Sequence, residues 1–346
     1  MSILKAITDS LELSVITFIL MSIVIAIAGT KLTKVADKLA DITGIGEAFM
    51  GGVMLGAMTS LPGSVTSISV AIKGFPELAV SNGLGGIVAQ TAFIGIADIA
   101  YKKANLEHAS ASIANLMFGV LLILLLAFIL IVSAMPEYHI IGIHPASFLL
   151  IFIYLAGLRM VRSAQKFPMW RPRITSDTEE DESNHDFVSK AKTRKLWVIF
   201  SVLAITVAFA GFMVAQTGVS LAEKTGFSET FVGTFFTAIS TSLPELMVSV
   251  AAVRQRAVTL AVSNIIGGNA YDVLFVSFSD FAYTEGSIYH EFSGELIFVL
   301  ALTIFMNAIL ILGMLDRETK GFAKIGWEGV LILFSFVSGF VVLYLW

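Results

Sequence analysis

The sequence contains no cysteine and few charged residues. None of its 346 residues is Cys, and 14% are Asp, Glu, Lys or Arg, against about 25% in soluble domains. The missing cysteines exclude disulfide frameworks, thiolate metal sites and cysteine nucleophiles. The net charge of −4 and the lack of a basic patch argue against a nucleic-acid partner. No Gly-x-Gly-x-x-Gly pattern predicts a nucleotide cofactor.

Apolar residues dominate instead, at 56% of the chain with a mean hydropathy of +0.86. A helix that crosses a bilayer needs about 20 mostly apolar residues. The apolar runs predict an all-α polytopic membrane protein with ten transmembrane helices, at 12–30, 46–72, 78–100, 111–134, 140–162, 196–221, 228–253, 257–281, 293–315 and 325–346. The first run is followed by GTKLTKVADK, not by a cleavage site, so we expect a spanning helix and no signal peptide.

The only long polar stretch, residues 163–195, predicts a linker between two membrane domains, 1–162 and 196–346. Lys and Arg are retained on the cytoplasmic side of membrane proteins. With ten spans, 19 of the 22 basic residues fall on one side, and only Lys5, Lys73 and Lys224 fall on the other. This predicts a cytoplasmic linker and two outside termini, in a prokaryotic plasma membrane. The linker's acidic middle lacks the spacing of an EF-hand loop, so we expect a solvated connection; a regulatory role is the alternative.

The two membrane domains share an internal repeat. Adding 182 to positions 59–90 gives positions 241–272 without a gap, and 12 of the 32 pairs are identical, including TSLP and SNxxGG. Five spans separate the two copies, and because five is odd the copies should run in opposite directions. We therefore expect two inverted-topology five-helix repeats, with core spans 46–72 and 78–100 in the first and 228–253 and 257–281 in the second, as in secondary transporters.

Each copy has a proline within an apolar span, Pro62 in span 2 and Pro244 in span 7. Proline lacks an N–H and clashes with the carbonyl four residues earlier, so both spans should be broken. Irregular backbone survives at membrane depth where it is buried or lines a cavity. Its carbonyls and the Thr and Ser hydroxyls beside them are ligands that hard cations prefer. The alternative is a structural kink whose carbonyls are satisfied by Ser and Thr.

Two carboxylates, Glu245 and Asp272, fall in the middle of predicted spans, where a charge is costly and indicates function. No Lys or Arg lies at that depth, so a transported cation is the expected partner; a protonated, packed acid is the alternative. Asn269 precedes Asp272 by one helical turn and can share its face. Asn82 and Asn264 are weaker candidates for the site, and the alternative is that they hydrogen-bond across the helix bundle. Four acidic residues near span ends are expected to have no role beyond an ion path: Glu47, Glu77, Asp98 and Asp280.

TSLPELMVSV followed by LAVSNIIGGNAYDVLF resembles the second α-repeat of the calcium/cation antiporter superfamily, in its sodium/calcium exchanger branch. TSLPGSVTSISV with LAVSNGLGGIVAQTAF resembles the first α-repeat in degenerate form. The resemblance covers about residues 49–93 and 231–275. It implies a ten-helix exchanger with outside termini that exchanges Ca²⁺ for Na⁺ or H⁺ by alternating access, with spans 1 and 6 sliding across the core.

The resemblance also implies a metal site. Its residues are Glu245, Thr241, Ser242, Ser249, Asn269 and Asp272 in the second repeat, Thr59, Ser60 and Ser67 in the first, and Gln90 at the position that matches Asp272. The first repeat departs from the family pattern, because Gly63 replaces the expected glutamate and Ile87 the asparagine. At most two carboxylates remain, which favours a stoichiometry lower than three Na⁺ per Ca²⁺, H⁺ coupling or a monovalent substrate.

The expected function is therefore secondary active cation antiport, with inorganic cations as the transported partners and no cofactor. The alternatives are a monovalent cation/H⁺ antiporter of the same fold, or a transport-inactive subunit that binds an ion as a sensor or assembly factor. We do not expect an enzyme, because no nucleophile–base pair is present. The five histidines lie outside the predicted core, at positions His108, His139, His144, His185 and His290.

Overall fold

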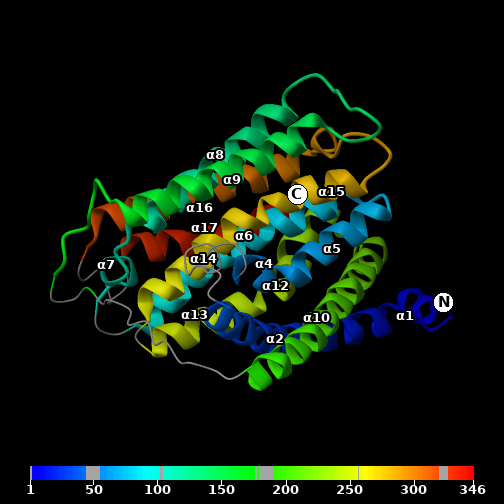
Figure 1. Ribbon diagram of the computed structural model, residues 1–346. Helices are drawn as coiled ribbons and strands as arrows, with labels where there is room; N and C mark the ends of the chain where they lie inside the picture. Colours follow the sequence, from blue (N-terminus) through cyan, green and yellow to red (C-terminus); the bar gives the residue numbers. More distant parts are fainter. Residues whose placement is uncertain are drawn as a thin grey trace.

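The computed structural model describes residues 2–43, 55–101, 104–175, 178, 190–255, 257–318 and 326–346. These residues are almost entirely helical, and they contain no strand beyond one isolated bridge between Ile140 and Ile143 (Figure 1). The predicted all-α fold is confirmed.

The helices of the two halves follow the predicted apolar runs. In the first half they are α1 (Ser2–Asp9), α2 (Leu11–Thr43), α4 (Leu55–Thr59), α5 (Leu61–Ile72), α6 (Pro76–Ala100), α7 (Leu106–Ala109), α8 (Ile113–Ser133) and α9 (Pro145–Lys166). In the second half they are α10 (Lys190–Thr225), α11 (Glu229–Phe231), the π-helix η2 (Val232–Thr237), α12 (Ala238–Thr241), α13 (Leu243–Arg254), α14 (Val258–Asp272), α15 (Leu274–Ala282), the 3₁₀ turn η3 (Ile288–His290), α16 (Gly294–Asp316) and α17 (Trp327–Leu345).

Each predicted span contains helix, but fewer than ten helices are long and apolar enough to cross a membrane alone. In the described residues seven meet that standard, and an eighth is the pair Glu229–Thr241 and Leu243–Arg254, which bends by 47° at Ser242. Span 2 is present as α4 and α5, and its first residues, 46–54, lie outside the described part. Span 8 consists of α14 and α15, which are separated at Val273. A total of ten spans stays a prediction.

The proline positions predict the helix breaks correctly. Helices α4 and α5 are separated at Ser60, and α12 and α13 at Ser242, two residues before Pro62 and Pro244 respectively. Each proline lies in the first turn of the following helix. The N–H groups of a first turn have no partner within the helix, so proline costs no hydrogen bond there. The break at Val273 and the π-helix η2 have no such signal in the sequence.

Several of the described helices keep the same offset of 182 residues. Helix α5 maps onto α13 at both ends, and α6 maps onto α14 and α15 together. Polar contacts show a reciprocal pattern. Asp98 accepts hydrogen bonds from the backbone N–H groups of Leu106 and Gly326, and Asp280 accepts them from Ile288 and His144, the residues 182 positions away. Each half thus supplies one donor to the aspartate of the other half.

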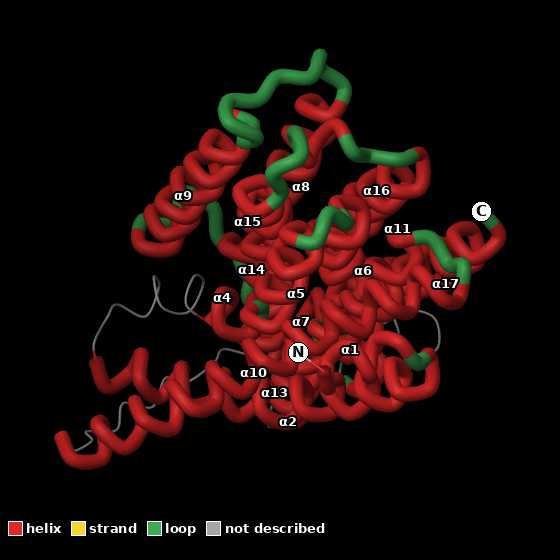
Figure 2. The backbone as a smooth tube through the Cα atoms, turned by 90° about the vertical axis from the view of Figure 1, so that its right-hand side faces the viewer, coloured by secondary structure: helices red, strands yellow, loops and turns green. Residues whose placement is uncertain are grey.

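The described helices form a buried core with two flanking groups. Helix α6 is the most central of the apolar helices, with 94% of its apolar window buried, whereas the corresponding window of α2 is 17% buried. The long helices α2 and α10 pack against each other on one face, and α8, α9, α16 and α17 lie on the other side of the core (Figures 1 and 2). The outward side chains of α2 include Ile16, Ile19 and Ile23, as expected for a surface that faces lipid.

Glycine at two positions allows the close contact between α6 and η2. A Cβ built on Gly85 would lie 2.4 Å from Thr234 Cα, and one built on Gly233 would overlap the Ser81 hydroxyl. The sequence suggests that Gly85, Gly86, Gly267 and Gly268 bring core spans together. Gly85 does so, whereas a Cβ on Gly267 would meet nothing within 4 Å.

Candidate cation site

The breaks in the two core spans bring five polar side chains together. Ser60 and Ser242 lie at the two breaks, Glu245 follows Pro244 in α13, Gln90 projects from α6, and Asp272 ends α14. All five side chains are buried, with Glu245 1% and Asp272 2% exposed. These residues were predicted from the sequence as site residues, and the structure places them in one cluster.

Hydrogen bonds connect the cluster across the two repeats. Ser60 Oγ donates to Glu245 Oε1 at 3.3 Å. Gln90 Nε2 donates to Asp272 Oδ2 at 2.6 Å and to Ser242 Oγ at 3.2 Å. Gln90 and Asp272 are related by the offset of 182, so these repeat partners contact each other directly.

Several oxygen atoms in this cluster face no donor. Among the described residues, Glu245 Oε2, Asp272 Oδ1, Gln90 Oε1 and Asn269 Oδ1 are buried without a hydrogen-bond partner. Buried acceptors are normally satisfied, and these four belong to carboxylates and amides, the ligand types of Na⁺ and Ca²⁺. The only ion pair within the described parts of the chain joins His139 and Glu137, so neither site carboxylate is neutralised by Lys or Arg there.

Three further predicted residues lie at the edge of the cluster. Thr59 hydrogen-bonds Glu245 through its side chain. Thr241 Oγ1 donates to Ala238 O at 3.2 Å, within its own broken helix. Asn269 Nδ2 donates to Thr91 Oγ1 at 3.1 Å, which leaves its carbonyl oxygen free. Thr91 was not recognised from the sequence.

Ser67 and Ser249 form matching hydrogen bonds to the next helix of their own repeat. Ser67 Oγ donates to Ala79 O at 2.9 Å and accepts from Asn82 Nδ2 at 2.9 Å. Ser249 repeats both bonds at the offset of 182, to Ala261 O and from Asn264 Nδ2, each at 3.3 Å. These hydroxyls join neighbouring helices, and the alternative that Asn82 and Asn264 hydrogen-bond across the helix bundle is confirmed. A ligand role for the two serines stays a prediction.

The ring of Phe275, from the second repeat, packs against Gly63 and fills the space where a side chain at position 63 would lie. A Cβ built on Gly63 would lie 2.7 Å from Phe275 Cε2 and 3.5 Å from Thr241 Oγ1. In the second repeat the matching position holds Glu245. An aromatic ring therefore packs against the place where the first repeat lacks a carboxylate. Phe275 was not recognised from the sequence.

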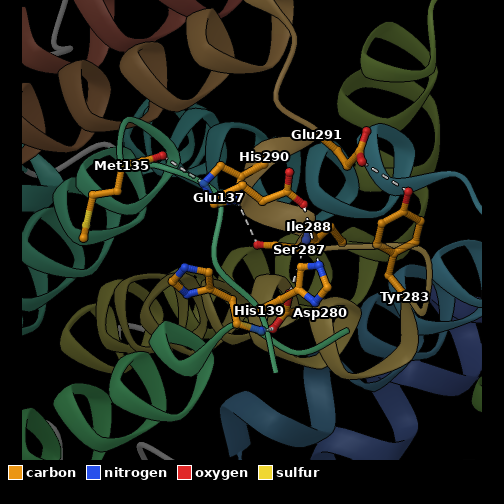
Figure 3. Close-up of polar contacts among 10 residues, drawn as sticks. Met135, Glu137, His139, Asp280, Tyr283, Ser287, Ile288, His290 and Glu291 are labelled. Carbon is orange, nitrogen blue, oxygen red and sulfur yellow. Dashed lines mark hydrogen bonds and ion pairs between the residues drawn. The ribbon is translucent and has the colours of Figure 1, made fainter. Parts of the chain in front are cut away.

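The carboxylates near the span ends have structural partners. Asp280 also accepts from Ser147 Oγ at 2.7 Å, in addition to the two backbone donors described above. Figure 3 shows the surrounding loops, where His290 lies between Met135 O at 3.0 Å and Ser287 Oγ at 3.1 Å. Asp98 and Asp280 thus anchor loops at opposite ends of the molecule, a role the sequence did not suggest. Glu47 and His185 lie outside the described residues.

The comparisons with known proteins agree with this fold. The family model for the sodium/calcium exchanger protein matches residues 13–161 and 195–346. The chain belongs to the sodium/calcium exchanger family. It is therefore an integral membrane protein of a family of cation exchangers and not an enzyme, and the predicted membership of the calcium/cation antiporter superfamily is confirmed.

Individual relatives match at low identity. The sodium/calcium exchanger MaX1 of Methanosarcina acetivorans is 28% identical over 152 residues, which cover 42% of this chain and only 39% of that protein. The solved structure of the sodium-calcium exchanger NCX_Mj is 18% identical with a TM-score of 0.62, over 96% of this chain and 99% of that one. The H⁺/Ca²⁺ exchanger CAX is 14% identical with a TM-score of 0.71, over 96% and 84% of the two chains. At these identities the two structures show a shared fold.

Proposed function

We propose that the protein is a secondary active antiporter that exchanges Ca²⁺ for Na⁺ or H⁺ by alternating access. The observation that carries this proposal is the pair of buried carboxylates, Glu245 and Asp272, which have free oxygens beside two paired helix breaks. A buried carboxylate without a cationic partner is costly. Binding of a cation removes that cost, and exchange for another cation keeps the site neutralised throughout a cycle.

The arrangement of the two long helices supports alternating access. Gly29 of α2 lies against Pro244, with a built Cβ 2.5 Å from its Cγ, and Gly211 of α10 lies against Pro62 O at 2.5 Å. Gly29 and Gly211 are again 182 residues apart, and each faces the broken helix of the other half. Helices α2 and α10 thus contact the two broken helices through glycines, which present no side chain. We infer that α2 and α10 can slide along the broken helices and open the site to one side of the membrane at a time.

Contacts between loops support the ten-span inverted topology with both termini outside. Thr8 O accepts from Ser220 Oγ near the end of span 6, and Trp346 packs against Gly294 at the start of span 9, so each end of the chain lies beside a span end assigned to the outer side. At the opposite end, His108 and Thr175 are hydrogen-bonded at 2.8 Å. These two residues belong to segments assigned to the cytoplasm, α7 and the described part of the linker, which lie together in Figure 1.

Transport in proteoliposomes tests the function. Vesicles loaded with Na⁺, or acidified inside, should accumulate ⁴⁵Ca²⁺ from the outside medium, and Glu245→Gln should abolish the uptake. The control is Glu137→Gln, which removes a carboxylate that is 58% exposed and outside the site. Unchanged flux in Glu245→Gln would refute the role of that residue. Counterflow of Na⁺ with H⁺ but never with Ca²⁺ would favour a monovalent cation/H⁺ antiporter, and saturable binding without counterflow would favour a sensor or assembly subunit.

The orientation has its own test, because the chain has no cysteine. Single substitutions His139→Cys and Arg171→Cys place one thiol in a loop assigned to the outside and one in the linker. In intact cells a membrane-impermeant maleimide should label the first and not the second. The reverse labelling would overturn the proposed orientation in the plasma membrane of a prokaryote.

A further inference from the structure

The surroundings of one aromatic side chain differ between the two halves of the molecule. Phe93 and Phe275 are repeat partners at the offset of 182. Phe275 lies in a slot between two glycines: a Cβ on Gly63 would lie 2.7 Å from its Cε2, and a Cβ on Gly83 would lie 3.1 Å from its Cβ. The corresponding positions in the second repeat are Glu245 and Ile265, which both carry side chains. The slot therefore exists in one half only.

The ring of Phe275 in this slot and a glutamate side chain at position 63 would occupy the same space. Real Cβ atoms essentially never approach another heavy atom within 3.0 Å, so no side chain fits at Gly63 while Phe275 keeps its position. Thr241 Oγ1 is 3.5 Å from the same built Cβ, which places this position beside the cluster that contains Glu245. A ring of carbon atoms supplies no oxygen ligand for a hard cation.

The remaining charge of the site is then limited. Gln90, the repeat partner of Asp272, is neutral and donates its amide N–H to that aspartate. Glu245 and Asp272 are thus the two carboxylates of the cluster, and together they balance one divalent or two monovalent cations. A third monovalent cation would leave a net positive charge in a buried site, where electrostatic interactions are several times stronger than in water.

We propose that Phe275, seated between Gly63 and Gly83, fixes the charge capacity of the site at two and makes the exchange electroneutral. One Ca²⁺ moves in one direction, and two Na⁺ or two H⁺ move in the other. Phe275 and Gly63 are the residues that determine this stoichiometry. The inference rests on the proposed antiport and adds to it a definite ratio and the residues that set it.

The test measures how the membrane potential affects the final Ca²⁺ distribution. Na⁺-loaded proteoliposomes take up ⁴⁵Ca²⁺ while valinomycin and a K⁺ gradient set the potential, and a second series uses a pH gradient in place of Na⁺. If one net charge moved per cycle, about 60 mV would change the equilibrium Ca²⁺ ratio about tenfold. The wild type should show no change in this ratio between zero and about 60 mV.

Substitutions then test the two residues. Gly63→Glu with Phe275→Ala restores a carboxylate and makes room for it, and its Ca²⁺ ratio should depend on the potential. Phe275→Ala alone is the matched control, which should stay independent of the potential, and Gly63→Glu alone should lose transport because the ring blocks the new side chain. A wild-type ratio that shifts about tenfold would overturn the electroneutral proposal and leave antiport intact. A folded, active double variant without potential dependence would overturn the role of the pair. The absence of any counterflow in the wild type would overturn the proposed function together with this inference.

Discussion

Replacing Asp272 by asparagine should strongly weaken Ca²⁺ binding while it stabilises the empty protein. Asn keeps the shape of the side chain and its acceptor for Gln90 Nε2, which lies 2.6 Å from Asp272 Oδ2, but it removes one of two negative charges. Loss of one partner from a buried charge pair costs about 3–5 kcal/mol. That corresponds to a rise in the Ca²⁺ Kd of about two to three and a half orders of magnitude.

The same change has the opposite effect without Ca²⁺. In the empty site two carboxylates, Glu245 and Asp272, share a buried cluster and repel each other. Asparagine removes this repulsion, so the variant should unfold at a higher temperature than the wild type in chelator. The two effects separate a ligand role from a general packing role, because a packing defect would lower stability in both conditions.

Thermal unfolding in detergent measures both effects. At a Ca²⁺ concentration of about 100 times the wild-type Kd, binding stabilises the wild type by about 2.7 kcal/mol. At the same concentration the stabilisation of Asp272→Asn should be below about 0.3 kcal/mol. Glu137→Gln, on an exposed loop, should keep the wild-type response. A wild-type Ca²⁺ response in Asp272→Asn would refute the assignment of this carboxylate to the site.

Three further predictions concern buried residues outside the cluster. Burial beside two other carboxyls raises the pKa of Glu107 well above its usual value. Between the unfolded and the folded pKa, the folded protein therefore holds a proton that the unfolded chain has released. The free energy of unfolding should fall as pH rises from below the unfolded pKa through the folded pKa. Glu107→Gln should remove this part of the slope when thermal unfolding is followed as pH rises above the unfolded pKa, and an unchanged slope would contradict the prediction. Ser249→Ala loses its bond to Ala261 O and should lower the free energy of unfolding by about 1 kcal/mol with the Ca²⁺ Kd unchanged; a large rise in Kd measured by titration would instead make Ser249 a ligand. Gly85→Ala places a Cβ 2.4 Å from Thr234 Cα and should destabilise the protein by about 1–3 kcal/mol, whereas a wild-type unfolding temperature would show that the two helices can separate at no cost.

Features that depend on neighbouring residues along the chain could be predicted from the sequence. The breaks at Ser60 and Ser242 follow from the prolines two residues later, since the effect of proline is confined to its own turn. The repeat offset identifies Gln90 as the counterpart of Asp272, and both were predicted as site residues; in the structure they are hydrogen-bonded to each other. The absence of Lys and Arg at the depth of Glu245 could also be read directly from the sequence.

Features that depend on contacts between distant segments could not be predicted. The π-helix η2 lies against α6 where Gly233 and Gly85 meet the opposite backbone, and neither glycine differs locally from others in the chain. Ser67 and Ser249 match the family motif by position, yet their hydroxyls bond the next helix of the same repeat. The place of Phe275 could have been suspected only by extending the repeat comparison three residues beyond Asp272.

The central claim is that Glu245 and Asp272 hold the transported cation between them. Anomalous diffraction at long wavelength from crystals grown with saturating Ca²⁺ locates that ion directly. We predict one strong peak beside Glu245 Oε2 and Asp272 Oδ1, the two oxygens without a hydrogen-bond donor, and no such peak in crystals of Asp272→Asn. A Ca²⁺ peak elsewhere in the membrane region, or an unchanged peak in Asp272→Asn, would contradict the account.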